Sequence, residues 1–140
     1  MLTPENTHRT LHVFNPSHDE ALAAGTPYYY PSVIARKLAS AWALLPALWA
    51  NNGDVVWVPD DVSTSSIPDW AQHVTLVHQS DLKKAFWETV HEIAPWGWDA
   101  LVRQQLNKAG APQTLLPNDE VLANVRQLSS RNTTALVLPK

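Results

Sequence analysis

The order of the predicted elements constrains the fold of this chain more than any other feature of its sequence. Short runs rich in β-branched residues alternate with longer segments in which apolar residues recur about every three to four positions. A strand, a helix and a second strand in succession are typical of a βαβ crossover, which makes the two strands parallel neighbours in one sheet. The sequence therefore predicts an α/β fold, an open, mostly parallel Rossmann-like sheet of about four strands with helices on both faces.

The predicted strands are short and end at proline or aspartate. The first is TLHVFNP and the second is DVVWVPDD, each stopped by a proline that cannot donate to a sheet ladder. The third lies in QHVTLVHQSD, and a brief fourth strand is predicted for TLLP. These four runs occupy residues 10–16, 54–61, 72–81 and 114–117.

The longest predicted helix runs from Ser32 to about Ala50. Pro46 interrupts it and removes a backbone hydrogen bond, so we expect a kink or a break and restart there. A second helix is predicted for residues 81–93, with Ser80 as its N-cap and Pro95 ending it. Asp99 is expected to cap a helix closed by Gly110, and Asn118 is expected to cap the last helix, which ends near Leu128.

Composition excludes several classes of protein. The chain has 140 residues, 45% of them hydrophobic, which suits one globular domain. Its net charge is −3 and its basic residues are scattered, so nucleic acid is not an expected partner. No secretory leader and no stretch of about 18 apolar residues occurs, so we expect a soluble, cytoplasmic protein with no membrane partner. The absence of cysteine excludes disulfides, thiolate metal sites and cysteine nucleophiles.

The stretch NPSHDE, residues 15–20, follows the first predicted strand, where ligands bind in open parallel sheets. Ser17 and Glu20 have the spacing of a capping box, in which each side chain accepts a hydrogen bond from the other residue's amide. Asp19 suits the positive end of the helix dipole, and Gly25 is expected to end the short helix. The cap needs neither Asn15 nor His18, and for His18 a structural and a functional role both remain open.

Other motifs with known chemistry are weak or missing. The four glycines form neither GxGxxG nor a P-loop, so no dinucleotide or phosphate cradle is predicted. Asp60 and Asp61 occupy the position that binds a ribose hydroxyl in dinucleotide enzymes, although a turn is the favoured reading. No GxSxG elbow is present to hold a serine nucleophile. His18 and Asp19 are adjacent and lack a third ligand at a recognisable spacing, so no metal site is predicted.

Aromatic and basic residues supply further candidates. At least one hydroxyl of the Tyr28 to Tyr30 loop is expected to face solvent or a ligand. The indoles of PWGWD are typical of rings that anchor a loop on the core. Arg126 and Arg131 are suited to an anion, but helix C-termini favour cations in any case.

Three stretches, FNPSHDEALAAG, PWGWD and LPNDEVLANVRQLSSR, together resemble the N-terminal part of a family of uncharacterised bacterial proteins whose longer members continue into an ATP-grasp-like domain. The resemblance covers most of the chain. It implies a pre-ATP-grasp domain, on the substrate side of a protein that ligates a carboxylate to an amine through an acyl phosphate. ATP and Mg²⁺ would be bound by a C-terminal ATP-grasp domain beyond residue 140. This chain would hold no cofactor and would be inactive alone.

The resemblance also assigns residues and boundaries. Residues 1–128 would form the pre-ATP-grasp-like domain, and residues 129–140 would begin the ATP-grasp domain. For Thr133 to Leu138 two structures remain open: a strand, which their propensity favours, and a helix, which the resemblance, a cap at Asn132 and Pro139 after its end favour. The small-molecule substrate would lie near the NPxHD pattern. By the resemblance, Asn15, His18 and Asp19 would face the substrate, and Ser17, Tyr28 and Tyr30 complete the substrate-binding candidates from their own positions in the sequence. By the resemblance, Ser129 and Arg131 would lie at the domain junction, and Trp96, Trp98 and Arg126 are the other junction candidates. No catalytic residue is assigned.

Two other function classes remain open. One is a stand-alone binding module that uses the tyrosine loop and the tryptophan turn as an aromatic surface. The other is a small hydrolase that depends on His18 and Asp19. The leading hypothesis is the substrate-side domain of an ATP-dependent ligase-like protein.

Overall fold

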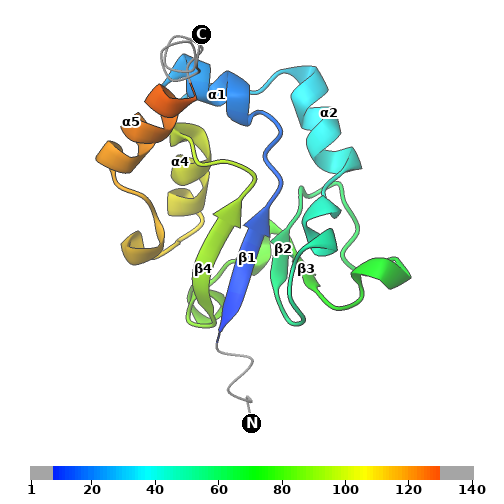
Figure 1. The fold of residues 1–140 in the computed structure, drawn as a ribbon. Helices are drawn as coiled ribbons and strands as arrows, with labels where there is room; N and C mark the ends of the chain where they lie inside the picture. The colour runs from blue at the N-terminus through cyan, green and yellow to red at the C-terminus, as the bar shows by residue number, and fades with distance from the viewer. Residues whose placement is uncertain (1–7, 130–140) are drawn as a thin grey trace, which may run out of the picture.

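A computed structural model describes residues 8–129 and contains a four-stranded sheet with all strands parallel. The strands lie in the order β3-β2-β1-β4 (Figure 1). Their bounds are β1 Arg9–Val13, β2 Val55–Trp57, β3 Thr75–Val77 and β4 Val90–Pro95. The prediction of an open, parallel α/β sheet is confirmed.

Helices and short 3-10 turns connect the strands. The helices are α1 His18–Ala24, α2 Val33–Ala41, α3 Lys84–Trp87, α4 Ala100–Lys108 and α5 Asp119–Leu128. The 3-10 turns are η2 Leu45–Leu48, η3 Asp69–Ala71, η4 Gln79–Asp81 and η5 Gln113–Leu115. None of the helices in the described part of the chain is long and apolar enough to cross a membrane.

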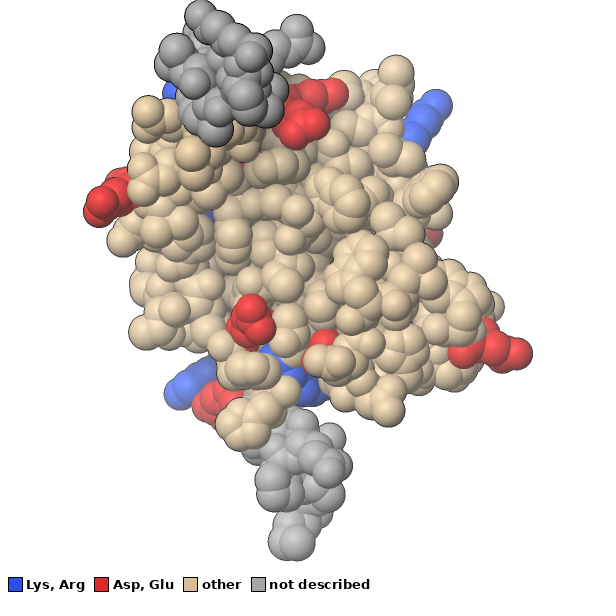
Figure 2. All heavy atoms as spheres, in the orientation of Figure 1, with Lys and Arg blue, Asp and Glu red and all other residues tan. Residues whose placement is uncertain are grey.

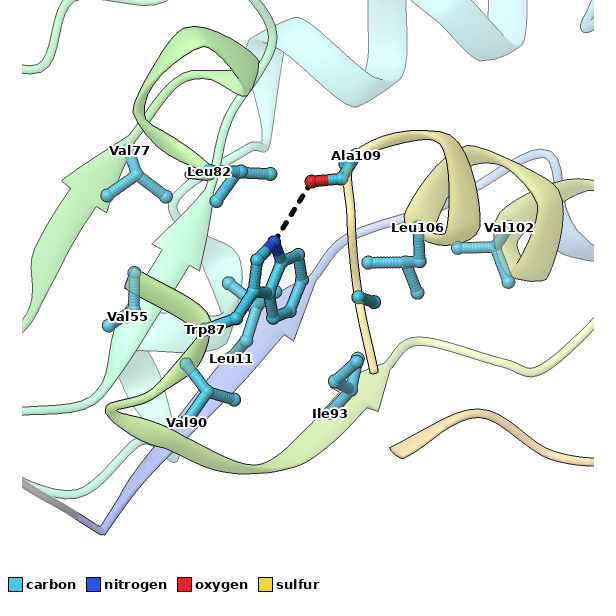
Figure 3. Close-up of a cluster of buried hydrophobic side chains, with 11 residues drawn as sticks. Leu11, Val55, Val77, Leu82, Trp87, Val90, Ile93, Val102, Leu106 and Ala109 are labelled. Atoms are coloured by element: carbon cyan, nitrogen blue, oxygen red, sulfur yellow. Dashed lines mark hydrogen bonds between the residues drawn. The ribbon is translucent and has the colours of Figure 1, made fainter. Parts of the chain in front are cut away.

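The two faces of the sheet bury separate apolar clusters, because successive side chains of a strand point to opposite faces. Val55 belongs to a cluster with side chains of α3 and α4, in which the Trp87 indole donates to the Ala109 carbonyl at 2.9 Å (Figure 3). The adjacent Val56 faces a smaller cluster built on η2 and η3. Helical and 3-10 segments therefore pack on both faces.

The helix predicted from Ser32 to about Ala50 breaks and restarts, as expected from the position of Pro46. Helix α2 ends at Ala41, and Pro46 occupies an early position of the separate turn η2, where its missing amide is not needed. The predicted side-chain caps of α4 and α5 are also confirmed. Asp99 accepts from the Val102 amide at 2.8 Å, and Asn118 accepts from the Val121 amide at 2.8 Å.

The predicted helix over residues 81–93 is wrong, because Val90–Pro95 forms the edge strand β4. Only Lys84–Trp87 is helical, and Lys83 rather than Ser80 precedes it. The pairing of β1 with β4 shifts register between Arg9 and Thr10, which leaves one extra residue in β4. This bulge puts Val90 and Ile93 in the same core cluster three residues apart, so the strand imitates a helical period.

The predicted strand TLLP is also wrong, since residues 113–115 form the turn η5. Leu115 and Leu116 pack against the core cluster as partly buried side chains. Their apolar character therefore reflects packing of a loop on the core, and β4 supplies the fourth strand instead.

His12 of β1 and Asp54, the residue before β2, form a buried pair. The His12 Nε2 atom lies 2.9 Å from an Asp54 carboxylate oxygen, and Asp54 also accepts from the amides of Thr10 and Asn51. Burial raises the pKa of Asp54, but these hydrogen bonds outweigh it and hold the pKa below its usual value. The pair fixes the start of β2 against β1.

Candidate functional site

The loops that follow β1 and β4 are tied together by one hydrogen-bonded network. The Asn15 amide donates to the Gly97 carbonyl at 2.8 Å and to Asp99 Oδ2 at 3.2 Å, and its oxygen accepts from the Gly97 amide. His18 Nδ1 lies 3.0 Å from the same Asp99 Oδ2. Asp99 is 2% exposed, and its second oxygen caps α4. The network joins the loops after β1 and β4, the neighbouring strands between which the order of the strands along the sheet reverses.

Gly97 has a steric role in this network. A methyl group on its α-carbon would lie 2.6 Å from His18 Cε1 and still closer to two other ring atoms. Its φ is not in the left-handed region, so the need for glycine comes from the imidazole that packs on it. Asn15, His18, Gly97 and Asp99 thus hold the loops after β1 and β4 together at the carboxyl ends of these strands.

The predicted capping box is wrong. Ser17 is the N-cap residue of α1, but its side chain makes no capping hydrogen bond. Glu20 instead accepts from the Tyr29 hydroxyl at 2.6 Å and from the Ser32 hydroxyl at 3.1 Å. These bonds lower the pKa of Glu20, and they tie the start of α2 to α1.

Beside this network lies an open cavity of about 370 Å³, which we call the carboxyl-edge cavity. Residues 13–17 at the end of β1, residues 57–60 at the end of β2, and Gln79 after β3 form one side. Side chains of α2 and α4 complete the lining. All the strands point towards the end of the molecule where α1 and α2 lie, which explains why these loops gather there (Figure 1). The volume is at the low end of the range for small-molecule sites.

The cavity combines apolar walls with charged groups. Its cations are Arg36 from α2 and Lys108 from α4, and its carboxylate is Asp60 after β2. Within residues 8–129, none of these three groups forms an ion pair. The guanidinium of Arg36 lies over the Tyr30 ring, with Cζ 4.8 Å from the ring centroid. Charged groups in the lining of a largely apolar recess are typical of a ligand site.

Of the substrate-binding candidates, the structure places Asn15 and Ser17 in the cavity lining. His18 lies in the adjoining network and is paired with Asp99 rather than with the exposed Asp19. Tyr28 and Tyr30 are 83% and 71% exposed. The aromatic loop is therefore open to solvent. Tyr30 does not line the cavity, but its ring contacts the guanidinium of Arg36, which does.

The domain-junction candidates are scattered. Trp96 is exposed and contacts Phe14 and Trp49, whereas Trp98 is partly buried against the core. Arg126 donates to the carbonyls of Leu22 and Ala23 at the end of α1, which gives it a structural role. Ser129 follows the last residue of α5. Arg131 and Thr133 to Leu138 lie outside the described residues.

Sequence reasoning missed Arg36, Lys108, Gln105 and the pairing of Asp99 with His18. The incorrect helix over residues 81–93 concealed that PWGWD follows a strand, at the edge where NPSHDE was placed. Recognising β4 would have brought Asp99 to His18. The two cations come from different helices, α2 and α4, which both contribute to the lining of the cavity.

Within residues 8–129, no three His, Asp or Glu side chains are grouped so that they could hold a metal ion. No protein-family model, curated protein or solved structure matches the chain.

Proposed function

We propose that this chain is the substrate-side domain of an ATP-dependent carboxylate–amine ligase-like protein. The observation that carries the proposal is the carboxyl-edge cavity, in which Arg36 and Lys108 have no carboxylate partner among the described residues. Two cations beside apolar walls suit a small organic acid. The sequence resemblance supplies the reaction class, which the cavity alone does not specify.

In this proposal the chain binds and orients the acid, and other parts of the polypeptide carry ATP. Arg36 and Lys108 hold the carboxylate, and the hydroxyl of Ser17 can donate to it. The carboxylate would attack the terminal phosphate of ATP to give an acyl phosphate and ADP, and an amine would then displace the phosphate. ATP and Mg²⁺ belong to the C-terminal ATP-grasp domain that the resemblance implies.

Asn15, His18 and Asp99 have positioning roles in this scheme. Their hydrogen bonds hold residues 15–17 against the loop after β4, and residues 15–17 form part of the cavity wall. None of them needs to touch the reacting atoms. The pairing of His18 with Asp99 gives no support to a hydrolase centred on His18 and Asp19.

The test is acid-dependent ADP release by the natural protein that contains this chain, assayed with ATP, Mg²⁺ and a panel of small carboxylic acids with amines. The variant Arg36→Gln should raise KM for the acid about tenfold, because a charge-assisted hydrogen bond is lost, and should leave KM for ATP unchanged. Lys37→Gln is the matched control, since Lys37 neighbours Arg36 but does not line the cavity. Absence of acid-dependent ADP release, or equal losses in both variants, would contradict the proposal.

A stand-alone interaction module remains the second candidate, because large apolar side chains are exposed. Ile34, Trp42, Trp49 and Trp96 each have at least half of their surface exposed. Most of the face drawn in Figure 2 also carries neither basic nor acidic side chains. Such a surface is typical of a protein contact. An ATP-grasp domain of the same polypeptide would be one occupant of it.

A further inference from the structure

We propose that the ligand of the carboxyl-edge cavity is a zwitterionic amino acid with an apolar side chain. Arg36 and Lys108 would bind its carboxylate, and Asp60 would bind its ammonium group. The inference deepens the proposed function, since it names the substrate class of the same cavity and depends on that cavity being the substrate site.

The first argument is the set of charges in the lining. Three contacts with ion-pair geometry are present within residues 8–129, and they join His12 to Asp54, His18 to Asp99 and Arg103 to Asp119. Arg36 and Lys108 are therefore available to an anion. Asp60 makes no hydrogen bond within the described residues, whereas its neighbour Asp61 accepts from the Ser40 hydroxyl at 2.9 Å. A cavity that offers unpaired charges of both signs complements a ligand that carries both.

The second argument is Ser17, which lines the cavity and is only 8% exposed. Within residues 8–129 its hydroxyl has no hydrogen-bond partner, and it does not cap α1. Within the described residues the one fully buried polar side-chain atom without a partner is His12 Nδ1, so the Ser17 hydroxyl stays accessible from the cavity that it lines. A ligand carboxylate in the cavity would accept a hydrogen bond from this hydroxyl.

The third argument is the apolar lining. Phe14 and Trp57 are partly buried and contribute aromatic surface, and three prolines add further apolar wall. About 370 Å³ is enough for a small ligand with an apolar side chain. The neutral amides of Gln79 and Gln105 at the cavity add no further charge. The lining therefore suits a ligand with charged groups at one end and an apolar remainder, such as the amino acid leucine.

A nucleoside monophosphate is the competing ligand, because Asp60 lies after β2, where a ribose is bound in dinucleotide enzymes. The chain lacks the glycine-rich turn that brings backbone amides to phosphate in those enzymes. A phosphate here would lack the backbone donors of that turn. The amino acid uses all three unpaired charges without that turn.

The experiment is isothermal titration of this protein with L-leucine and with its two halves, 4-methylpentanoate and isopentylamine. L-valine, L-methionine, L-phenylalanine and L-tryptophan, each with its own deaminated acid and decarboxylated amine, and AMP complete the panel. At least one amino acid should bind, and it should bind about tenfold or more tightly than its deaminated or decarboxylated half, because each half leaves one charge of the cavity unpaired.

Variants identify the residues. Arg36→Gln and Asp60→Asn should each weaken amino-acid binding about tenfold, and Asp60→Asn should leave the affinity for the acid alone unchanged. Lys37→Gln and Asp61→Asn are the matched controls, since neither residue lines the cavity, and both should bind like the wild type. All four side chains are exposed, so folding should not be affected.

Three results of the titrations would overturn the inference: no binding of any amino acid up to about 10 mM, equal affinity for the amino acid and its deaminated acid, or binding of AMP alone. The proposed function fails separately. Amino-acid binding without ADP release from the natural protein would contradict the ligase function but agree with the amino acid as the ligand. Acid-dependent ADP release that requires Arg36 but not Asp60 would agree with the ligase function but contradict the amino acid as the ligand.

Discussion

Replacing Asp54 with alanine is expected to destabilise the protein by about 3 kcal/mol, because its carboxylate accepts three hydrogen bonds in a buried position. The substitution leaves the amides of Thr10 and Asn51 without this acceptor. It also leaves His12 buried with neither ring nitrogen bonded, since its Nδ1 already has no partner among the described residues. Urea unfolding at neutral pH measures the loss.

The control for this prediction is Asp69→Ala, which removes an exposed carboxylate from the start of η3 and should change stability by less than about 0.5 kcal/mol. The pKa of Asp54 is lowered in the folded protein, so its contribution is present above the unfolded pKa and is lost as the pH falls through the folded pKa. The penalty of Asp54→Ala should therefore shrink below about pH 4. A loss of less than about 1 kcal/mol at neutral pH would mean that the pair contributes little.

Replacing Gly97 with alanine is expected to destabilise the protein by about 2 kcal/mol, because the new methyl group would overlap the His18 ring. The ring would have to move away from Asp99, and the two hydrogen bonds between Asn15 and Gly97 would be strained. The same change in a His18→Ala background should cost less, since the obstructing ring is absent. The double-mutant cycle should give a coupling energy of about 1 kcal/mol or more.

Gly53→Ala is the contrasting control. Gly53 has a φ of 86° and nothing near its α-carbon that a methyl group would meet, so its substitution strains only the backbone. The loss of stability should be the same with and without His18. If Gly97→Ala behaved in that way too, the packing of His18 on Gly97 would not be what holds the two loops together.

The fold could be predicted from sequence where local pattern and tertiary packing agree. The residues around β1, β2 and β3 combine β-branched side chains with proline or aspartate at their ends, and Asn118 and Asp99 cap the helices they precede. The pattern failed at β4, where the bulge imposes a spacing of three on Val90 and Ile93. Pairing with β1 decides the structure there, and no local rule contains that information.

The site was only partly accessible to the same reasoning. NPSHDE was placed correctly at the carboxyl end of β1, yet the roles within it differ from those expected. Glu20 binds Tyr29 and Ser32 instead of capping with Ser17, and His18 binds a carboxylate more than eighty residues away in sequence. Capping boxes are local, so sequence can suggest them. A partner such as Asp99 is determined by the strand order.

The central claim is that a small molecule binds between the loops after β1, β2 and β3, and NMR titration with L-leucine and 4-methylpentanoate tests it most directly. The Trp57 indole N–H signal and the side-chain amide signals of Gln79 and Gln105 should shift with ligand concentration, because these groups line the cavity. The indole signals of Trp49 and Trp96, which do not line it, should stay unchanged. Shifts at Trp49 and Trp96 with none at Trp57 would contradict the claim and favour the aromatic surface as the binding site.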